Sequence, residues 1–137
     1  MRGLWLLIGL LGATGVTLGA HAAHGLEGQL AEMGLSSEEI AKRLNQSEVG
    51  VRYLMFHVLA LLGVCANSAR LSPRSLKLIA SLFLLGMLMF SGGLFLMVYA
   101  GVIGHWAIVP GGGLFLILGW LALAASAFSR TSQQSVS

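Results

Sequence analysis

The chain has 137 residues, of which 56% are hydrophobic and only 9% charged, whereas about a quarter of the residues in a typical soluble domain are charged. With a mean hydropathy of +0.85, it lacks the polar shell that a water-soluble domain needs, so we expect an integral membrane protein with the lipid bilayer as its partner. The 8 Lys and Arg residues outnumber the 5 acidic residues, but they are scattered rather than clustered, which argues against nucleic-acid binding.

Residues 4–20 form the first predicted span, an uncharged run that follows Arg2 and is long enough to cross a bilayer. The same residues also resemble a secretory signal peptide with a small-residue cleavage site at residues 20–22, which is the alternative interpretation. Four glycines at helical spacing would let another helix approach closely. We favour packing inside the chain over a dimer face for this stripe, which consists of Gly9, Gly12, Gly15 and Gly19.

A polar segment follows from Leu26 to Ser47, and all five acidic residues lie between Glu27 and Glu48. Within it, Ser36-Ser37-Glu38-Glu39 fits a capping box, the pattern that begins many helices. We therefore predict a short amphipathic helix from Ser37 to about Gln46 that lies at the membrane interface.

Three further apolar runs predict the second, third and fourth spans at residues 49–66, 76–100 and 111–128. A short basic turn at residues 67–74 joins the second span to the third, and Pro110 suits the first turn of the fourth. The prediction is an all-α, four-helix membrane bundle that forms one domain over residues 1–130. A flexible tail is expected at residues 131–137.

Two polar side chains in the second span stand out because ionisable groups are costly in lipid. Arg52 lies near the end of the span and can extend to the headgroups, whereas His57 lies deeper and should find a hydrogen-bond partner on a neighbouring helix. Four spans place five basic residues on one side of the membrane and Lys42, Arg43 and Arg52 on the other. By the positive-inside rule both termini are expected in the cytoplasm, on the side that holds Arg2, Arg70, Arg74, Lys77 and Arg130.

The chain also carries four motifs in a recognisable order. They are Gly-Ala-x-Ala-Ala-His-Gly-Leu at residues 19–26, Arg-Tyr-Leu-Met-Phe-His at 52–57, Phe-Ser-Gly-Gly-Leu at 90–94, and Pro-Gly-Gly at 110–112 with Gly-Trp at 119–120. Together they resemble the YgdD-like family of small uncharacterised membrane proteins. The resemblance implies a four-helix protein of the bacterial inner membrane without an established reaction. Residues that match the family pattern are His24, Gly25, Tyr53, His57, Ser91, Gly92 and Pro110, whereas His21 departs from it.

Three interpretations of the histidines are open. In the favoured one, His24 and His57 hydrogen-bond to Ser91, to Tyr53 or to a backbone carbonyl and fix the helix crossing. In the second, His21, His24 and His57 supply nitrogen ligands for a metal or haem. In the third, the histidines and Arg52 serve proton or solute transport, or bind a lipid or quinone between spans.

An enzyme is the least supported class, because the chain contains no Asp, no phosphate loop and no arrangement of Ser, His and Asp. No resident cofactor is predicted. We expect a structural or accessory subunit that associates with a larger membrane complex or with further copies of itself. The candidate polar cluster consists of His24, Arg52, Tyr53, His57 and Ser91.

Overall fold

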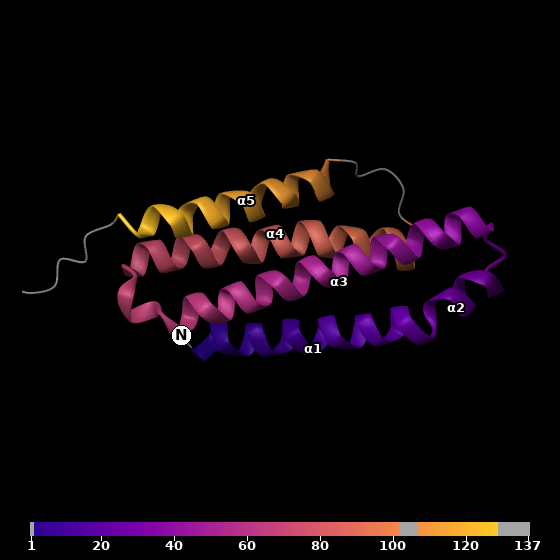
Figure 1. Cartoon of the computed structure of the whole chain (residues 1–137), viewed down its shortest axis with the longest axis horizontal. Helices are drawn as coiled ribbons and strands as arrows, with labels where there is room; N and C mark the ends of the chain where they lie inside the picture. Colours follow the sequence, from indigo (N-terminus) through magenta and orange to yellow (C-terminus); the bar gives the residue numbers. More distant parts are fainter. Residues whose placement is uncertain (1, 102–106, 129–137) are drawn as a thin grey trace, which may run out of the picture.

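The computed structural model describes residues 2–101 and 107–128, and the regular structure of those residues is helical throughout (Figure 1). Four helices are long and apolar enough to cross a membrane, which confirms the predicted all-α membrane bundle. The predicted flexible tail and His105 lie outside the described residues. The helices in chain order are α1 (Arg2–His24), α2 (Leu26–Glu32), α3 (Ser37–Ala66), η1 (Ser68–Arg70), α4 (Pro73–Ala100) and α5 (Ile108–Ser126).

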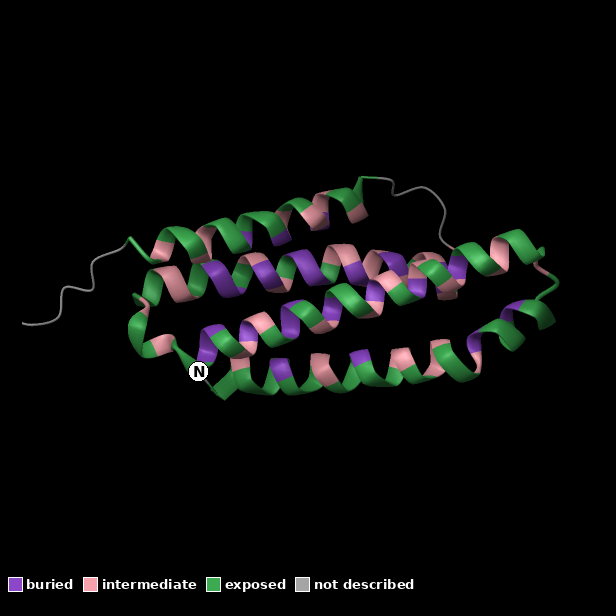
Figure 2. Cartoon of the chain, viewed as in Figure 1, coloured by how far each residue is buried: buried purple, intermediate pink, exposed green. Residues whose placement is uncertain are grey.

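The four long helices run antiparallel and lie side by side in the order α1, α3, α4 and α5 (Figure 1). Each packs mainly on its neighbour in this row: α1 on α3, α3 on α4, and α4 on α5. Short connections favour this arrangement because they bring consecutive helices together. The helices at the two edges of the row, α1 and α5, therefore have broad exposed surfaces (Figure 2).

The predicted helix start at Ser36 is confirmed, because its Oγ accepts a hydrogen bond from the Glu39 amide at 3.3 Å. The prediction of a separate interfacial helix at residues 37–46 is wrong, since α3 continues without a break to Ala66. Nothing between Gln46 and the apolar run interrupts the helix, and Ser47 and Gly50 are buried there. The short helix between the first two spans is instead α2, which buries Leu26 and Leu30.

The core lies along α3 and α4, where Leu61, Ile79 and Phe83 are completely buried. Glycines set the distance between α4 and α5. A Cβ on Gly112 would lie 2.4 Å from the backbone nitrogen of Phe90, so the two helices meet backbone to backbone there.

The glycines of α1 divide into two groups. A Cβ on Gly12, Gly15 or Gly19 would meet side chains of α3, which confirms the expected packing of the stripe inside the chain for these three. A Cβ on Gly9 would meet no atom within 4 Å. One part of the stripe is therefore used by the fold, and Gly9 lies at an open position.

Candidate functional site

The buried histidine of the second span, His57, uses both of its ring nitrogens. Nδ1 lies 2.7 Å from the backbone oxygen of Tyr53, one turn earlier in α3. Nε2 lies 3.1 Å from Nε1 of Trp120 in α5. Because an indole N–H can only donate and a carbonyl can only accept, Nε2 is the acceptor and Nδ1 carries the proton. This pair of contacts fixes one neutral tautomer of His57.

Aromatic rings surround His57 and come from three helices. The ring of Phe83 in α4 lies 5.5 Å from His57 and 5.3 Å from Trp120, in both cases edge to face. The ring of Tyr53 stacks with His57 at a centroid distance of 6.1 Å and lies 4.6 Å from the ring of Phe90 in α4. Such pairs add to the packing energy beyond the area they bury. His57 therefore joins α3, α4 and α5.

The rest of the predicted polar cluster is not assembled around His57. Arg52 forms an ion pair with Glu48 on the exposed side of the same helix. Ser91 is buried in α4, but its hydroxyl has no hydrogen-bond partner among the described residues. Of the alternative partners predicted for the histidines, His57 therefore uses a backbone carbonyl, that of Tyr53, and not Ser91. His24 is exposed at the end of α1. Of the five predicted residues, the structure brings together only Tyr53 and His57.

His21 belongs to a separate contact at the junction of α1 and α2. Its Nε2 lies 3.1 Å from Oε1 of Gln29 in α2, and its ring lies 5.7 Å from that of Tyr99 in α4. Gly25 makes the turn between α1 and α2, and its amide donates to the His21 carbonyl at 2.9 Å. His21 thus holds the short helix α2 against its neighbours.

The predicted metal site at His21, His24 and His57 is not formed. Across residues 2–101 and 107–128, no group of three or more His, Cys, Asp or Glu side chains is arranged to hold a metal ion. His57 in addition has no free ring nitrogen in this arrangement, since both nitrogens contact protein atoms. The sulfur of Cys65 is buried in α3.

Sequence reasoning missed the role of Arg43. It is buried, and its Nη1 donates to the carbonyl of Val98 at 3.1 Å, close to the end of α4 at Ala100. Gly101, with a φ of 63°, caps this end. The last carbonyls of a helix have no partner within the helix, so Arg43 satisfies one of them from another helix. The spacing along the helix could have indicated its burial, because residue 43 lies on the same helix face as the buried Ser47 and Gly50.

Arg43 is itself neutralised by Glu39, whose Oε1 accepts from its Nε at 3.0 Å. The hydrogen bond from Arg43, with a second from Lys42, lowers the pKa of the Glu39 carboxyl below its usual range. Glu39 lies in the first turn of α3, before the apolar stretch. The contacts from Glu39 to Arg43 and from Arg43 to Val98 thus connect the start of α3 to the end of α4.

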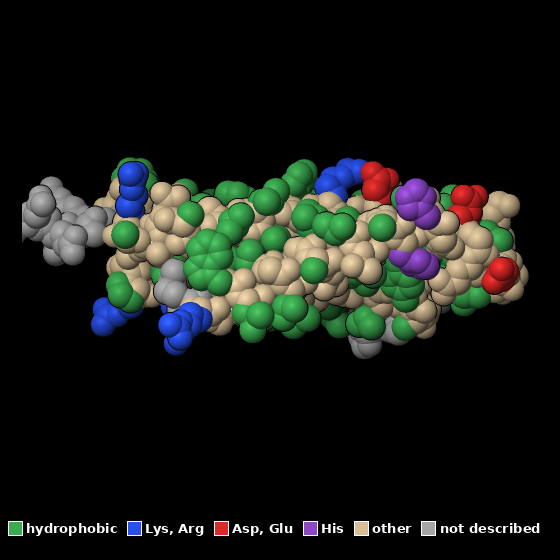
Figure 3. All heavy atoms as spheres, turned by 90° about the horizontal axis from the view of Figure 1, so that it is seen from below, with side chains coloured by type: hydrophobic (Ala, Val, Ile, Leu, Met, Phe, Trp, Pro, Cys, Tyr) green, Lys and Arg blue, Asp and Glu red, His purple; other side chains and the backbone are tan. Residues whose placement is uncertain are grey.

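Acidic side chains lie toward one end of the molecule, whereas basic side chains lie toward both ends. Figure 3 shows Lys and Arg side chains at the left end of one face, whereas the right half of that face has acidic and His side chains together with one basic group that lies beside an acidic one. The three ion pairs among the described residues all lie between Glu39 and Arg52 of α3.

Comparison with known proteins covers most of the chain. Residues 18–113 match a family model described as protein of unknown function (DUF423). A UPF0382 membrane protein of Haemophilus influenzae is 36% identical over 127 residues, which are 92% of this chain and 94% of the relative. The UPF0382 membrane protein YwdK of Bacillus subtilis is 31% identical over 126 residues, covering 90% and 95%, and one from Staphylococcus haemolyticus is 35% identical over 115 residues, covering 82% and 84%. No solved structure matches the chain.

Proposed function

Because the chain belongs to the DUF423 family of membrane proteins of unknown function, we propose that it is a structural or accessory subunit of a membrane assembly rather than an enzyme. The assembly partner is a larger membrane complex or a second copy of the chain. The protein would act by packing against this partner within the bilayer.

The observation that carries the proposal is that the other helices of the chain bury very little of α1. Only Ile8 and Gly15 of this full-length span are buried, and Leu6, Leu10 and Val16 are exposed by more than half. Lipid tolerates such a surface, but helix association in a membrane depends on close packing at small residues. The open position at Gly9 on this surface would allow a partner helix to approach.

The state of His57 supports a structural role over a chemical one. A general base, a proton carrier or a metal ligand needs a lone pair that is free or easily freed. Both nitrogens of His57 instead hold α3 to α5 and to its own backbone. We therefore infer that His57 serves to hold α3 and α5 together by its hydrogen bond to Trp120.

We also propose the bacterial plasma membrane as the location, with both termini in the cytoplasm, and membership of the YgdD-like branch. Five basic residues on the terminal side against three on the other support the orientation. The matching residues of the first two motifs, His24 with Gly25 and Tyr53 with His57, support the branch.

Reporter fusions at the C-terminus test the proposed orientation. A fluorescent-protein fusion there should fluoresce, and a periplasmic phosphatase fusion there should be inactive. The reverse pattern would overturn the orientation.

Site-specific photo-crosslinking in living cells tests the proposed role. A photoreactive amino acid at Leu6, Leu10 or Val16 of α1 should give one and the same protein adduct, which mass spectrometry identifies as another subunit or a second copy. The matched control is Leu88, which is 72% exposed on α4; there we expect lipid adducts only. Lipid adducts alone at all three α1 positions would contradict the proposal.

A further inference from the structure

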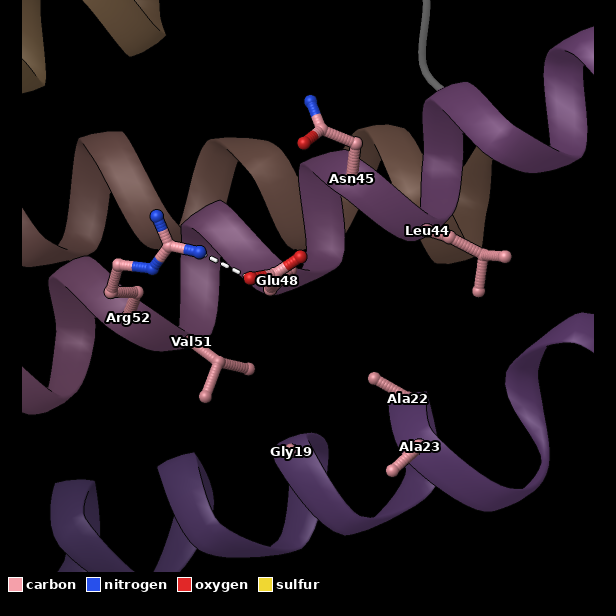
Figure 4. Close-up of a pocket in the computed structure, with 8 residues that line it drawn as sticks. All are labelled: Gly19, Ala22, Ala23, Leu44, Asn45, Glu48, Val51 and Arg52. Carbon is pink, nitrogen blue, oxygen red and sulfur yellow. Dashed lines mark hydrogen bonds and ion pairs between the residues drawn. The ribbon is translucent and has the colours of Figure 1, made fainter.

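A cleft between α1 and α3 opens where the tight packing of the two helices ends (Figure 4). At Gly19 a Cβ would still lie 3.3 Å from Val51, so the helices are close at that level. One turn further along α1 the lining residues are Ala22 and Ala23, whose short side chains do not fill the space. The resulting cavity measures about 530 Å³, a volume within the usual range for small-molecule sites.

The opposite wall of the cleft carries a charged pair. Glu48 and Arg52 lie one turn apart on α3 and form an ion pair, drawn as a dashed line in Figure 4. Both remain accessible, because the Glu48 side chain is 66% exposed and the Arg52 side chain 51% exposed. The apolar side chains of Leu44 and Val51 line the same wall. The cleft thus combines an apolar surface with one cation and one anion.

The charged pair lies at the level expected for lipid headgroups. Arg52 is near the start of the apolar stretch 49–66, and a basic side chain at such a place extends to the membrane surface. Glu48 precedes that stretch by one residue. A molecule that entered the cleft from the bilayer would meet the apolar surface with its chains and the charged pair with its headgroup.

We propose that this cleft binds a phospholipid whose headgroup is phosphoethanolamine. A guanidinium has five N–H donors, so Arg52 can bind phosphate oxygens while it keeps its contact with Glu48. The second carboxylate oxygen of Glu48 accepts a hydrogen bond from the primary ammonium, and the acyl chains lie along Val51 and Gly19. This lipid site goes beyond the proposed structural role and does not depend on a protein partner.

The charges also predict selectivity among headgroups. A phosphatidylglycerol headgroup offers the phosphate but brings no cation to Glu48, so the second carboxylate oxygen receives no hydrogen bond from an ammonium group. A phosphatidylcholine headgroup brings a cation without an N–H, so it cannot donate a hydrogen bond to Glu48. Phosphoethanolamine is the headgroup among these three that satisfies both side chains.

Native mass spectrometry of the purified full-length chain tests the proposal, with phosphatidylethanolamine, phosphatidylglycerol and phosphatidylcholine of identical acyl chains in equal amounts. Wild-type protein should retain one phosphatidylethanolamine about fivefold over either competitor, the ratio that about 1 kcal/mol of charge-assisted contact at an exposed site supplies. Equal retention of the three lipids by the wild type would overturn the proposal without any variant.

Variants then locate the site. Glu48→Gln should remove the preference over phosphatidylglycerol, Arg52→Gln should weaken retention of all three lipids, and Ala23→Leu should fill the cleft and reduce binding with both charges intact. Matched controls are Arg74→Gln at the opposite end and Ala13→Leu on the exposed surface of α1; both should bind as wild type. Wild-type binding by Ala23→Leu, unchanged selectivity in Glu48→Gln, or an equal loss in the controls would contradict this cleft as the site.

A competition arm separates the lipid from a soluble phosphoester. Millimolar glycerophosphoethanolamine, which carries the same headgroup without acyl chains, should leave the bound lipid in place because the apolar wall contributes to binding. Displacement of the lipid by the soluble headgroup would show that the cleft takes a water-soluble ligand and would overturn the lipid assignment.

Discussion

The burial of His57 makes both of its hydrogen bonds necessary for stability. An imidazole buried among aromatic rings loses its contacts with water, and a donor or acceptor without a partner there costs free energy. Tyr53 supplies the acceptor within the same helix, whereas the donor comes from Trp120 in α5. The bond to Trp120 is therefore the one that ties two helices together.

Trp120→Phe should destabilise the protein, because the ring is largely replaced but the indole N–H is lost and Nε2 of His57 has no donor. We expect a loss of about 0.5–1.5 kcal/mol, the range measured for side-chain hydrogen bonds between membrane helices. Unfolding by denaturing detergent followed by circular dichroism measures it. Trp5→Phe, at an exposed tryptophan of α1, is the control; an equal effect of the two substitutions would refute the role of the hydrogen bond.

Glu39→Gln should remove part of the acid sensitivity of folding. Because Arg43 and Lys42 lower the pKa of Glu39 in the folded chain, the pair contributes fully above about pH 4.3, the ordinary value of a glutamate. The contribution disappears as the pH falls through the lower folded pKa. Wild-type thermal unfolding temperature should fall between about pH 6 and pH 3 by more than that of Glu39→Gln. Glu27→Gln in α2 should keep the wild-type slope, and a wild-type slope in Glu39→Gln would count against the pair.

At the scale of helices, close approach between α4 and α5 depends on glycines in both. Gly86 faces Leu116, Gly119 faces Phe83, and Gly112 faces the backbone of Phe90. A side chain can turn away from an added methyl group, but a helix backbone can only move as a whole. Gly112 is therefore the position where this interface is least able to adapt.

Gly112→Ala should separate α4 from α5 and cost about 1–3 kcal/mol, as overpacking of a well-packed interface does. Gly63→Ala is the matched control in α3, since a Cβ there meets no atom within 4 Å. Thermal unfolding of the two purified variants in one detergent gives the comparison. If Gly112→Ala proved as stable as Gly63→Ala, the backbone contact between α4 and α5 would be disproved.

The sequence predicted the spans because long uncharged runs have few other stable outcomes, and it predicted the cap at Ser36 from local chemistry. It misplaced the helix boundary at residues 37–46, because the burial of Ser47 and the packing of Gly50 against Phe95 of α4 depend on tertiary structure. The pairing of Tyr53 with His57 follows from their spacing of one turn. The contact of His57 with Trp120, 63 residues away, depends on how the helices pack and could not be predicted from local spacing.

At the scale of the whole molecule, the helices form a row with two open edges (Figure 1). The centre of the row contains the buried core, the aromatic rings around His57 and the bond from Arg43 to α4. The edge at α1 has two buried residues and an unoccupied position at Gly9. The centre therefore provides the stability of the fold, and the α1 edge is the surface that we propose for a partner.

The most direct measurement of this central claim is the mass of the assembly extracted from native membranes, compared between Gly9→Phe and Gly63→Phe. In the single chain a Cβ on either glycine would meet no atom within 4 Å, so both variants should fold as wild type. We predict that wild type and Gly63→Phe elute in particles well above the mass of one 14.4 kDa chain with its detergent, and that Gly9→Phe alone elutes as a single chain. Identical single-chain masses for all three proteins, or an assembly that survives Gly9→Phe, would contradict a partner at the α1 edge.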